Sequence, residues 1–434
     1  MQRIEIKNFG PIKELNLDIK DFILLIGPQA SGKSTIAKTI FFFKSLNDEL
    51  VKYFIDAIDK NDFSKSTGTY AKSVRQKFLD YFGASTHLSG LLIKYFYSET
   101  IWISITLESN HRYITPVFSE KFEYNLKLLV NEAIDYSKIN GHRNPSLLTS
   151  KDLLELDLKK RKFISYLKEK CNSIFQEDRE LLFIPAGRSL LATLSDQLQY
   201  VNPRRLDFLM RTFLDKINIV RPIFNKSLND IIKERRLLTQ QQIDYSKTKN
   251  AEEIITKILR GKYQYDKDGE KIFYDSNNYV KLNFSSSGQQ ESLWILLLLF
   301  IIILEQQNVF VVIEEPEAHL FPEAQKEISN LIALMSNIKK SQVIITTHSP
   351  YILASLNNLI LAHKVGSTNQ DEINKKINKN LWINRDKVFA AIVEDGSVKD
   401  IIDQDLKIIQ QERIDAVSSI INSEFDFLYQ FETE

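Results

Sequence analysis

Alternating apolar and polar positions predict strands in the first 120 residues. A period of two covers residues 4–19, with a break at Gly10-Pro11, and predicts two strands joined by a turn. Residues 22–26 are all apolar, which is typical of a strand buried on both faces. Two paired strands and a possible third are predicted at residues 91–97, 101–107 and 113–118.

Helical periodicity predicts the next elements. Apolar positions recur every three to four residues over 34–50 and 70–82, and the sequence from about residue 121 onward is helical and polar. One compact helix face is predicted from a seam of apolar residues: Leu206, Met210, Phe213, Ile217 and Val220. We expect a mainly helical insertion over residues 120–265, in which residues 181–189 return to the domain formed by residues 1–119 and 266–434.

The second half of the chain alternates strand and helix patterns. A hairpin is predicted over residues 261–284, and continuous apolar runs at 309–313 and 342–347 predict central parallel strands. Between them, residues 293–304 form twelve uninterrupted apolar positions, whereas a membrane span takes about 20. This stretch predicts a helix buried on all sides, and the whole pattern predicts an α/β fold.

Composition narrows the class of protein. The chain is 43% hydrophobic and 26% charged, as in globular proteins, and its 57 basic and 56 acidic residues give no overall attraction to nucleic acid or membranes. Cys171 is the one cysteine, which excludes an intrachain disulfide and a Cys-rich zinc site. The N-terminus lacks the apolar core of a signal peptide. We therefore expect a cytoplasmic protein that does not enter a membrane.

The strand at residues 22–26 runs into a phosphate-binding pattern, G-x-x-x-x-G-K-S. Its residues are Gly27, Pro28, Gln29, Ala30, Ser31, Gly32, Lys33, Ser34 and Thr35. Such a loop surrounds phosphates with backbone N–H groups, while the lysine neutralises the outer phosphates and the Ser hydroxyl binds Mg²⁺. The glycines allow close approach of the backbone and positive φ angles. The sequence predicts a nucleotide site here.

A second anion-binding helix end is predicted at the start of the apolar helix. Ser285, Ser286, Ser287 and Gly288 precede Gln289 and would present N–H groups and hydroxyls to a phosphate. An ordinary serine N-cap would give the same pattern, so this stretch alone leaves both interpretations open.

Carboxylates and a histidine follow the two predicted parallel strands. Glu314 and Glu315 come directly after one strand, and His348 ends the next. Carboxylates beside a phosphate loop can hold the water shell of Mg²⁺ and polarise an attacking water, and an imidazole can bind a γ-phosphate or that water. These residues are candidates for hydrolysis chemistry.

Two basic features are less specific. Residues 181–189 predict a buried strand ending in a sharp turn that exposes Arg188, a candidate contact to phosphate or to a partner subunit, or equally a surface arginine. Residues 159–162 form the densest positive run, which we interpret as a solvated helix face in preference to a nucleic-acid contact.

Together, these motifs resemble the ATP-binding-cassette ATPases of the branch that contains RecF, the SMC proteins and the OLD-type ATPases. The resemblance implies an ABC-type P-loop head, with a mixed sheet flanked by helices and an antiparallel sheet. It implies that residues 27–35 are Walker A, that Ser286 to Gln289 are the signature, and that His348 is the switch histidine. The signature departs from L-S-G-G-Q, with Ser285 and Ser287 in place of Leu and the first Gly.

By the same resemblance, Glu314 stands at the metal position in place of the usual Asp, Glu315 is the catalytic carboxylate, and residues 317–320 form the D-loop. No residue is assigned to the Q-loop glutamine. In this family two heads sandwich two ATP molecules. The resemblance therefore implies ATP and Mg²⁺ as cofactors, slow regulatory ATP hydrolysis, and a homodimer or higher even oligomer.

The motifs I-E-E-P-E-A-H-L, I-P-A-G-R-S and S-S-S-G-Q-Q-E resemble those of the OLD, Septu and PARIS defence ATPases. That likeness implies an antiphage sensor or assembly subunit working with a separately encoded nuclease. The alternative is a RecF-like repair ATPase that binds DNA directly.

The end of the chain resembles the opening strand and glutamate of a Toprim nuclease at residues 391–396. Only 40 residues follow Glu394, so we expect a strand and turn that end the head, and no nuclease domain. Residues 394–434 hold eleven acidic and three basic residues, which disfavours contact with DNA and favours a basic partner.

Overall fold

The computed structural model describes ten segments of the chain. They are residues 1–64, 66–84, 90–107, 113–140, 149–193, 206–238, 243–403, 405–406, 408–410 and 416–429. The chain forms two compact units. The first contains residues 1–19, 30–181 and 394–398, and the second contains residues 20–29, 182–393 and 399–434. The boundaries expected at residues 119/120 and 265/266 stay a prediction.

The first unit contains a five-stranded sheet with the order β2-β1-β4-β5-β6. Ile6 lies opposite Leu15 on one side and Ile93 on the other, and all three are buried. This register places the apolar residues of alternating strands on one face, as their period of two predicts. The strands are β1 Arg3–Phe9, β2 Ile12–Asp18, β4 Leu91–Phe96, β5 Trp102–Leu107 and β6 Thr115–Phe118, and each neighbouring pair is antiparallel.

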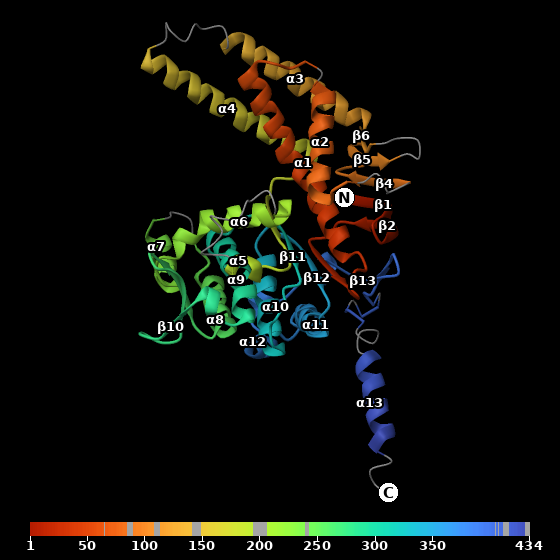
Figure 1. The fold of residues 1–434 in the computed structure, drawn as a ribbon, viewed down its shortest axis with the longest axis vertical. Coiled ribbons are helices and arrows are strands. Elements are labelled where there is room, and N and C mark those ends of the chain that lie inside the picture. The colour runs from red at the N-terminus through yellow and green to blue at the C-terminus, as the bar shows by residue number, and fades with distance from the viewer. Residues whose placement is uncertain are drawn as a thin grey trace. The chain divides into compact units, whose positions relative to one another are not determined.

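Four long helices complete the first unit (Figure 1): α1 Lys33–Lys60, α2 Ser66–Phe82, α3 Glu120–Asn140 and α4 Ser150–Phe175. Helix α1 was expected to end near residue 50 but continues to Lys60, because Tyr53, Phe54 and Ala57 extend its buried face. Helices α3 and α4 pack on each other, and the rings of Tyr136 and Phe163 stack with centroids 4.1 Å apart.

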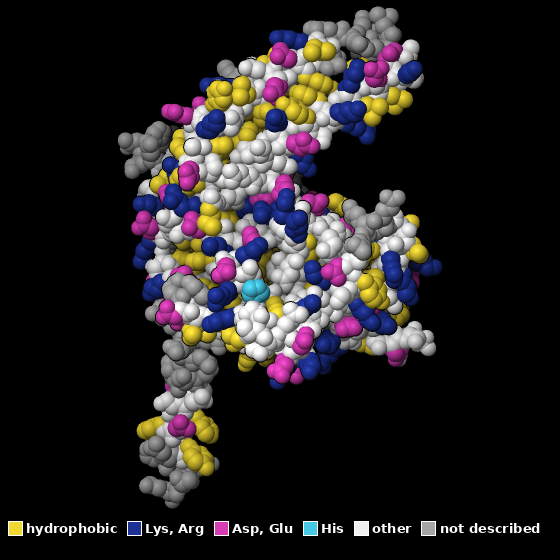
Figure 2. Space-filling model, turned by 180° about the vertical axis from the view of Figure 1, so that it is seen from behind, with side chains coloured by type: hydrophobic (Ala, Val, Ile, Leu, Met, Phe, Trp, Pro, Cys, Tyr) yellow, Lys and Arg dark blue, Asp and Glu magenta, His cyan; other side chains and the backbone are white. Residues whose placement is uncertain are grey.

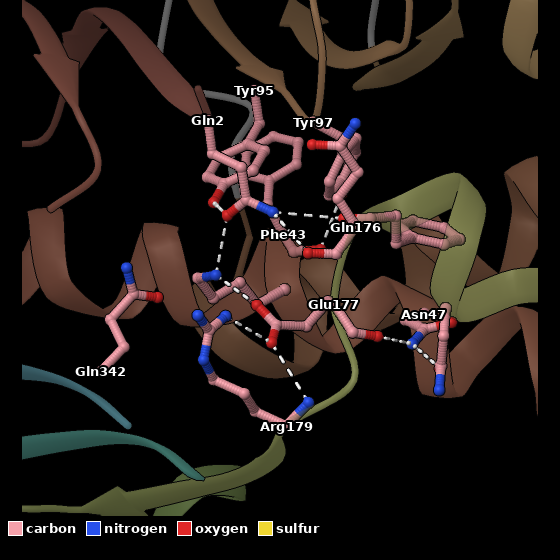
Figure 3. A network of polar contacts seen from close by, with 12 residues as sticks. Gln2, Phe43, Asn47, Tyr95, Tyr97, Gln176, Glu177, Arg179 and Gln342 are labelled. Carbon is pink, nitrogen blue, oxygen red and sulfur yellow. Dashed lines mark hydrogen bonds and ion pairs between the residues drawn. The ribbon is translucent and has the colours of Figure 1, made fainter. Parts of the chain in front are cut away.

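A buried polar network joins α1 to the end of α4 in this unit (Figure 3). Lys44 forms an ion pair with Glu177, and its Nζ also donates to Gln2 Oε1 at 2.8 Å. The Tyr95 hydroxyl donates to the same Gln2 oxygen at 2.8 Å, and Arg179 Nη1 donates to Glu177 Oε1 at 2.9 Å. Because a buried charge is tolerated only when paired and hydrogen-bonded, this network fixes the position of α1.

The positive run of α4 makes ion pairs with nearby carboxylates. Lys159 and Arg161 pair with Glu155 and Asp157, each one turn away on α4, and Lys160 pairs with Asp59 of α1. On the face drawn in Figure 2, Lys and Arg side chains are interspersed with Asp and Glu. These exposed ion pairs agree with the solvated helix face that the sequence predicts for residues 159–162.

The second unit contains the central strands of a six-stranded sheet with the order β14-β13-β3-β12-β11-β7. Strand β3 runs parallel to both β12 and β13, and β11 runs parallel to β12. The strands are β3 Phe22–Ile26, β7 Glu180–Ile184, β11 Val309–Glu314, β12 Gln342–Thr347, β13 Val388–Glu394 and β14 Ser397–Asp400. Strands β3, β11 and β12 are buried along their whole length, which confirms the predicted central parallel strands.

Helix α9 (Ser287–Glu305) lies in the core of the second unit. It is the one helix in the described part of the chain that is long and apolar enough to cross a membrane, and 83% of its most apolar window is buried inside the structure. The prediction of a helix buried on all sides is confirmed. Each fully buried Leu or Ile contributes about 1.5–3 kcal/mol relative to an exposed one.

The other helices of this unit are α5 Ser189–Thr193, α6 Phe208–Val220, α7 Leu228–Leu238, α8 Tyr245–Leu259, α10 Pro322–Ser336, α11 Pro350–Val365, α12 Gln370–Lys376 and α13 Ala416–Tyr429. Helix α6 buries Phe213, Ile217 and Val220 in the same core as α9, as the apolar seam predicts. The predicted hairpin forms a small antiparallel sheet of β8 Lys262–Asp266, β9 Gly269–Phe273 and β10 Tyr279–Lys281.

Asp395 and Gly396 have φ angles of 51° and 77° and form the turn between β13 and β14. The strand and turn expected near the end of the domain are therefore present. Parallel strands that alternate with helices, together with separate antiparallel sheets, confirm the predicted α/β class.

Candidate nucleotide-binding site

The phosphate loop links β3 to α1, and two of its glycines adopt conformations that other residues rarely adopt. Gly27 has a φ of 149°, and a Cβ there would lie 2.2 Å from the carbonyl oxygen of Val393. Gly32 has a φ of 108°, and a Cβ there would lie 2.4 Å from Ile12 Cδ1. Both positions therefore require glycine.

Gly32 is also the N-cap of α1, and no side chain among the described residues caps this helix. The first turn of an uncapped helix presents N–H groups and a positive dipole end to an anion. Lys33, the first residue of α1, is buried, and Ser31 is buried with no hydrogen-bond partner for its hydroxyl in the described part of the chain. The loop therefore has the geometry that a phosphate-binding loop needs.

Glu314 ends β11 and is buried, with 4% of the residue exposed. Its Oε2 accepts a hydrogen bond from the Ala186 N–H at 3.3 Å. Its Oε1 is buried without a hydrogen-bond partner among the described residues. A buried carboxylate oxygen without a protein partner fits a cation or one of its water ligands.

Two more buried polar atoms lack partners at the same edge of the sheet. Thr346 lies opposite Glu314 in the β11–β12 register, and neither its Oγ1 nor Glu317 Oε2 has a hydrogen-bond partner in the described segments. Unpaired buried polar groups are costly, so such a group needs an explanation. These atoms fit a site for water or a hydrated cation beside the strand ends. Among the residues at this edge, Glu314 is the carboxylate that could hold Mg²⁺ or one of its water ligands.

Glu315 and His348 face each other across the ends of β11 and β12. Their side chains meet with His348 Nε2 3.1 Å from Glu315 Oε1. Glu315 has a φ of 43°, an uncommon angle for a residue with a side chain, and its N–H donates to Thr346 O at 2.9 Å. The Glu315 side chain is 38% exposed and that of His348 is 28% exposed, so this pair is accessible.

Glu317, in the expected D-loop, bonds to the end of β12 at the expected switch histidine, His348. Its Oε1 accepts hydrogen bonds from the Thr347 hydroxyl and from the His348 N–H, both at 2.7 Å. The backbone that carries His348 is thereby held to the segment that follows the two glutamates.

Ser286 forms an N-cap at the expected signature. Its Oγ accepts from the Gln289 N–H at 3.3 Å, while Gln289 Oε1 accepts from the Ser286 N–H at 3.2 Å, which makes a capping box. Gln289 also donates to Leu259 O at 2.7 Å. The serine N-cap that the sequence left open is therefore present.

The expected signature borders a surface cleft of about 850 Å³ in the second unit. A Cβ on Gly288 would lie 2.7 Å from His319 O, so the start of α9 packs tightly against the segment after Glu317. The cleft is lined by Lys257, Ile258, Leu259, Arg260, Ser286, Ser287, Gly288, Gln289, His319, Leu320, Phe321, Glu323, Ala324, Lys326 and Glu327.

Arg188 was expected to be exposed, and this prediction is wrong. Only 2% of the residue is exposed, because its guanidinium is enclosed by main-chain carbonyls and by Glu291. A surface contact to phosphate or to a partner subunit is therefore not available to it in this structure.

Sequence reasoning missed Glu291, the partner of Arg188. This residue is 1% exposed and lies in α9, two residues before the apolar run at residues 293–304. The available signal was the charge itself, because a buried carboxylate beside an uninterrupted apolar run needs a partner.

The fold and this site define the class, a P-loop ATPase-domain protein. Residues 1–353 match the family model of the AAA ATPase domain, AAA_15, and the chain therefore belongs to this family. No curated protein matches.

Similar solved structures are head domains of SMC proteins. The SmcHead bound to the C-winged helix domain of ScpA is 14% identical, with 92% of this chain and 96% of that chain covered and a TM-score of 0.42. The SMC head domain from Thermotoga maritima is 12% identical, with coverage of 92% and 97% and a TM-score of 0.37. The Smc head domain with an extended coiled coil, bound to the C-terminal domain of ScpA derived from Pyrococcus furiosus, is 15% identical, with coverage of 97% and 100% and a TM-score of 0.38.

Proposed function

We propose that this chain binds and hydrolyses ATP through head dimerisation and serves as the ATPase subunit of an antiphage defence system, with a separately encoded nuclease as effector. The observation that carries the ATPase part is the 3.1 Å contact of Glu315 with His348 at the strand ends, next to the buried Glu314. A base, a polar partner and a metal-binding carboxylate at one edge are the groups that hydrolysis of a phosphoanhydride needs.

Each group has a distinct role in this mechanism. Glu315 accepts a proton from the attacking water, and His348 orients that water or the γ-phosphate. Lys33 neutralises charge on the outer phosphates, and the N-terminus of α1 binds them through N–H groups. Mg²⁺, when bound, neutralises the charge that develops on the phosphate oxygens.

The proposed dimer rests on the signature. Ser286 and Gln289 bond to each other in the capping box, so the N–H groups of the first turn of α9 and the Ser287 hydroxyl would receive the γ-phosphate bound by a second head. Two heads would then enclose two ATP molecules, and hydrolysis would remove the group that joins them.

The defence role rests on motif likeness to the Septu and PARIS ATPases, which work with a separate nuclease. It is tested by co-purification with the product of the adjacent gene, followed by a mass measurement with and without ATP. A stable complex with a nuclease supports the role. If the purified protein alone binds duplex DNA with strong dependence on both ATP and salt, the RecF-like alternative is correct instead.

The ATPase assignment predicts opposite behaviour for two variants. Glu315→Gln should keep ATP affinity, lower kcat by about 10²–10⁴-fold and accumulate the ATP-bound dimer, because it removes the base but not the binding groups. Lys33→Ala should weaken ATP binding itself. Fluorescent-nucleotide titration, phosphate release and light scattering measure these three quantities.

Asp386→Asn is a matched control, because this side chain is 77% exposed and takes no part in the proposed site. It should behave as wild type in all three assays. Wild-type turnover in Glu315→Gln, or wild-type ATP affinity in Lys33→Ala, would contradict the assignment.

A further inference from the structure

Arg188 lies in the turn after β7 and bonds to the backbone of the two glutamates at the end of β11. Its Nη1 donates to Glu314 O at 2.7 Å and to Pro185 O at 2.5 Å, and its Nη2 donates to Glu315 O at 3.0 Å. Only 1% of the side chain is exposed. A planar guanidinium can hold several carbonyls at fixed positions, which a lysine ammonium cannot do.

The same arginine is bound to the signature helix. Its Nε donates to Glu291 O at 3.0 Å, and its Nη2 lies 3.3 Å from Glu291 Oε1. The Glu291 carboxylate also accepts from the N–H groups of Arg188, at 3.0 Å, and of Ser189, at 2.6 Å. Glu291 follows the signature on α9 by less than one helical turn.

The charge of Arg188 is balanced from several sides. Burial lowers the pKa of the guanidinium, and the carboxylates of Glu291, Glu314, Glu317 and Glu315 raise it. Glu291 is the largest of these four influences. The arginine is thus surrounded by the metal-binding and catalytic carboxylates and by one carboxylate of the signature helix.

The backbone of Glu315 needs neighbouring groups that hold it in place. Its φ of 43° is a left-handed conformation that costs free energy in a residue with a side chain, and such a conformation persists only where neighbouring groups fix it. Arg188 binds the carbonyls of Glu314 and Glu315, on either side of the Glu315 N–H and Cα.

We propose that Arg188 and Glu291 couple the signature helix to the catalytic glutamate. When the first turn of α9 receives the γ-phosphate of an ATP molecule bound by a second head, the Glu291–Arg188 contact sets the backbone of Glu315 in its reactive position. Arg188 is a positioning residue and does not touch the nucleotide. This inference rests on the proposed ATPase function and adds a route by which dimerisation controls hydrolysis.

The test compares four proteins with wild type: Arg188→Lys, Glu291→Gln, the double variant, and the control Arg221→Lys. Arg221 also pairs with a buried carboxylate, Glu270, at 3.6 Å in the same unit. The measurements are the unfolding midpoint, ATP affinity, ATP-dependent dimer mass and ATPase rate per head over a range of protein concentrations. Glu291→Gln keeps the shape of the side chain, so this variant still tests the coupling if Arg188→Lys does not fold.

Wild type should show a rate per head that rises as dimers form. In both single variants kcat should fall by about 10–100-fold, as expected of a misplaced catalytic group, while ATP affinity stays within about threefold and dimers still form. The double variant should lose no more than the single variants, because the two residues act as one unit. Arg221→Lys should keep the wild-type rise.

The inference is overturned if folded Glu291→Gln or Arg188→Lys keeps the wild-type dependence of rate on dimer formation, if the losses of the two variants add, or if Arg221→Lys loses kcat in the same way. Failure of the proposed function looks different, because Glu315→Gln would then retain turnover whatever Arg188 does.

Discussion

Gly288, in the expected signature, lies where the structure leaves little room for a side chain. The nearest atom to a Cβ at this position would be a backbone oxygen, His319 O, at 2.7 Å, so a methyl group would push the first turn of α9 away from the segment after Glu317. The tight packing that the structure shows at this glycine makes it a sensitive probe of the signature.

Gly288→Ala should leave ATP affinity within about threefold of wild type, because the phosphate loop is unchanged, and should weaken the ATP-dependent dimer by about tenfold or more. Light scattering with ATP measures the dimer. Gly68→Ala is the matched control: Gly68 lies in α2 with no atom within 4 Å of its Cβ position, so alanine should be neutral or stabilise the helix by about 0.5–1 kcal/mol. Normal dimerisation of Gly288→Ala would argue against the role of the signature.

Cys171 provides a second test at single-residue scale. The thiol is buried in α4, and burial raises its pKa to about 12. At pH 8 roughly one thiol in 10⁴ is then ionised, and the thiolate is the reactive form. Labelling with a disulfide reagent should be at least about 100-fold slower in the folded protein than in 6 M guanidinium, and should speed up as pH rises. Equal rates in the two conditions would show that this part of α4 is not packed as described.

At the scale of elements, α1 connects two features of the first unit. It begins at the phosphate loop and carries Lys44 eleven residues further on, about 16 Å along its axis. Lys44 and Glu177 are both almost fully buried, and the network around them also holds Gln2, Tyr95 and Arg179. The helix that presents Lys33 is therefore fixed at its middle by a buried ion pair.

Lys44→Ala should destabilise the folded state by about 3–5 kcal/mol, because it leaves the Glu177 carboxylate buried without its main cation. The double variant Lys44→Met/Glu177→Leu should recover most of this loss, since it removes both charges. Urea unfolding measures the difference. The exposed pair Lys7–Glu14 is the comparison: Lys7→Met should change stability by less than about 1 kcal/mol. A Lys44→Ala effect as small as that of Lys7→Met would contradict the importance of this network.

At the scale of the whole molecule, the proposed function depends on a second copy. The phosphate loop and the signature are on one chain, yet the proposed mechanism completes each ATP site with the signature of another. In this arrangement the binding of the metal ion, the binding of the nucleotide and the association of two chains are linked equilibria, so removal of one component weakens the other two interactions.

With excess EDTA, ATP hydrolysis should fall by about 10³-fold or more, because the phosphate charge loses its counter-ion. Added Mg²⁺ should restore it. Glu314→Gln should raise the Mg²⁺ concentration needed for half-maximal rate by about tenfold, since it removes the charge of a proposed ligand. If the Mg²⁺ requirement is the same in wild type and in Glu314→Gln, the proposed metal position is wrong.

The sequence by itself determined the local features of this protein. Periodicity predicted β1 to β5 and the buried α9, and the G-x-x-x-x-G-K-S pattern predicted the turn between β3 and α1, because these features depend on neighbouring residues and on the φ angles that glycine permits. The order of Glu314, Glu315 and His348 after two apolar runs was enough to predict candidate chemistry at adjacent strand ends.

The tertiary structure decided which polar side chains are buried and what they contact. Arg188 follows a turn signal that predicts exposure, but it is buried because Glu291, 103 residues away, and the carbonyl of Glu314, 126 residues away, enclose it. The contact of His348 with Glu315 and the pairing of Lys44 with Glu177 also join distant parts of the chain. Partners so far apart in sequence leave no local pattern, and the free energy that allows a charge to be buried comes only from the assembled fold.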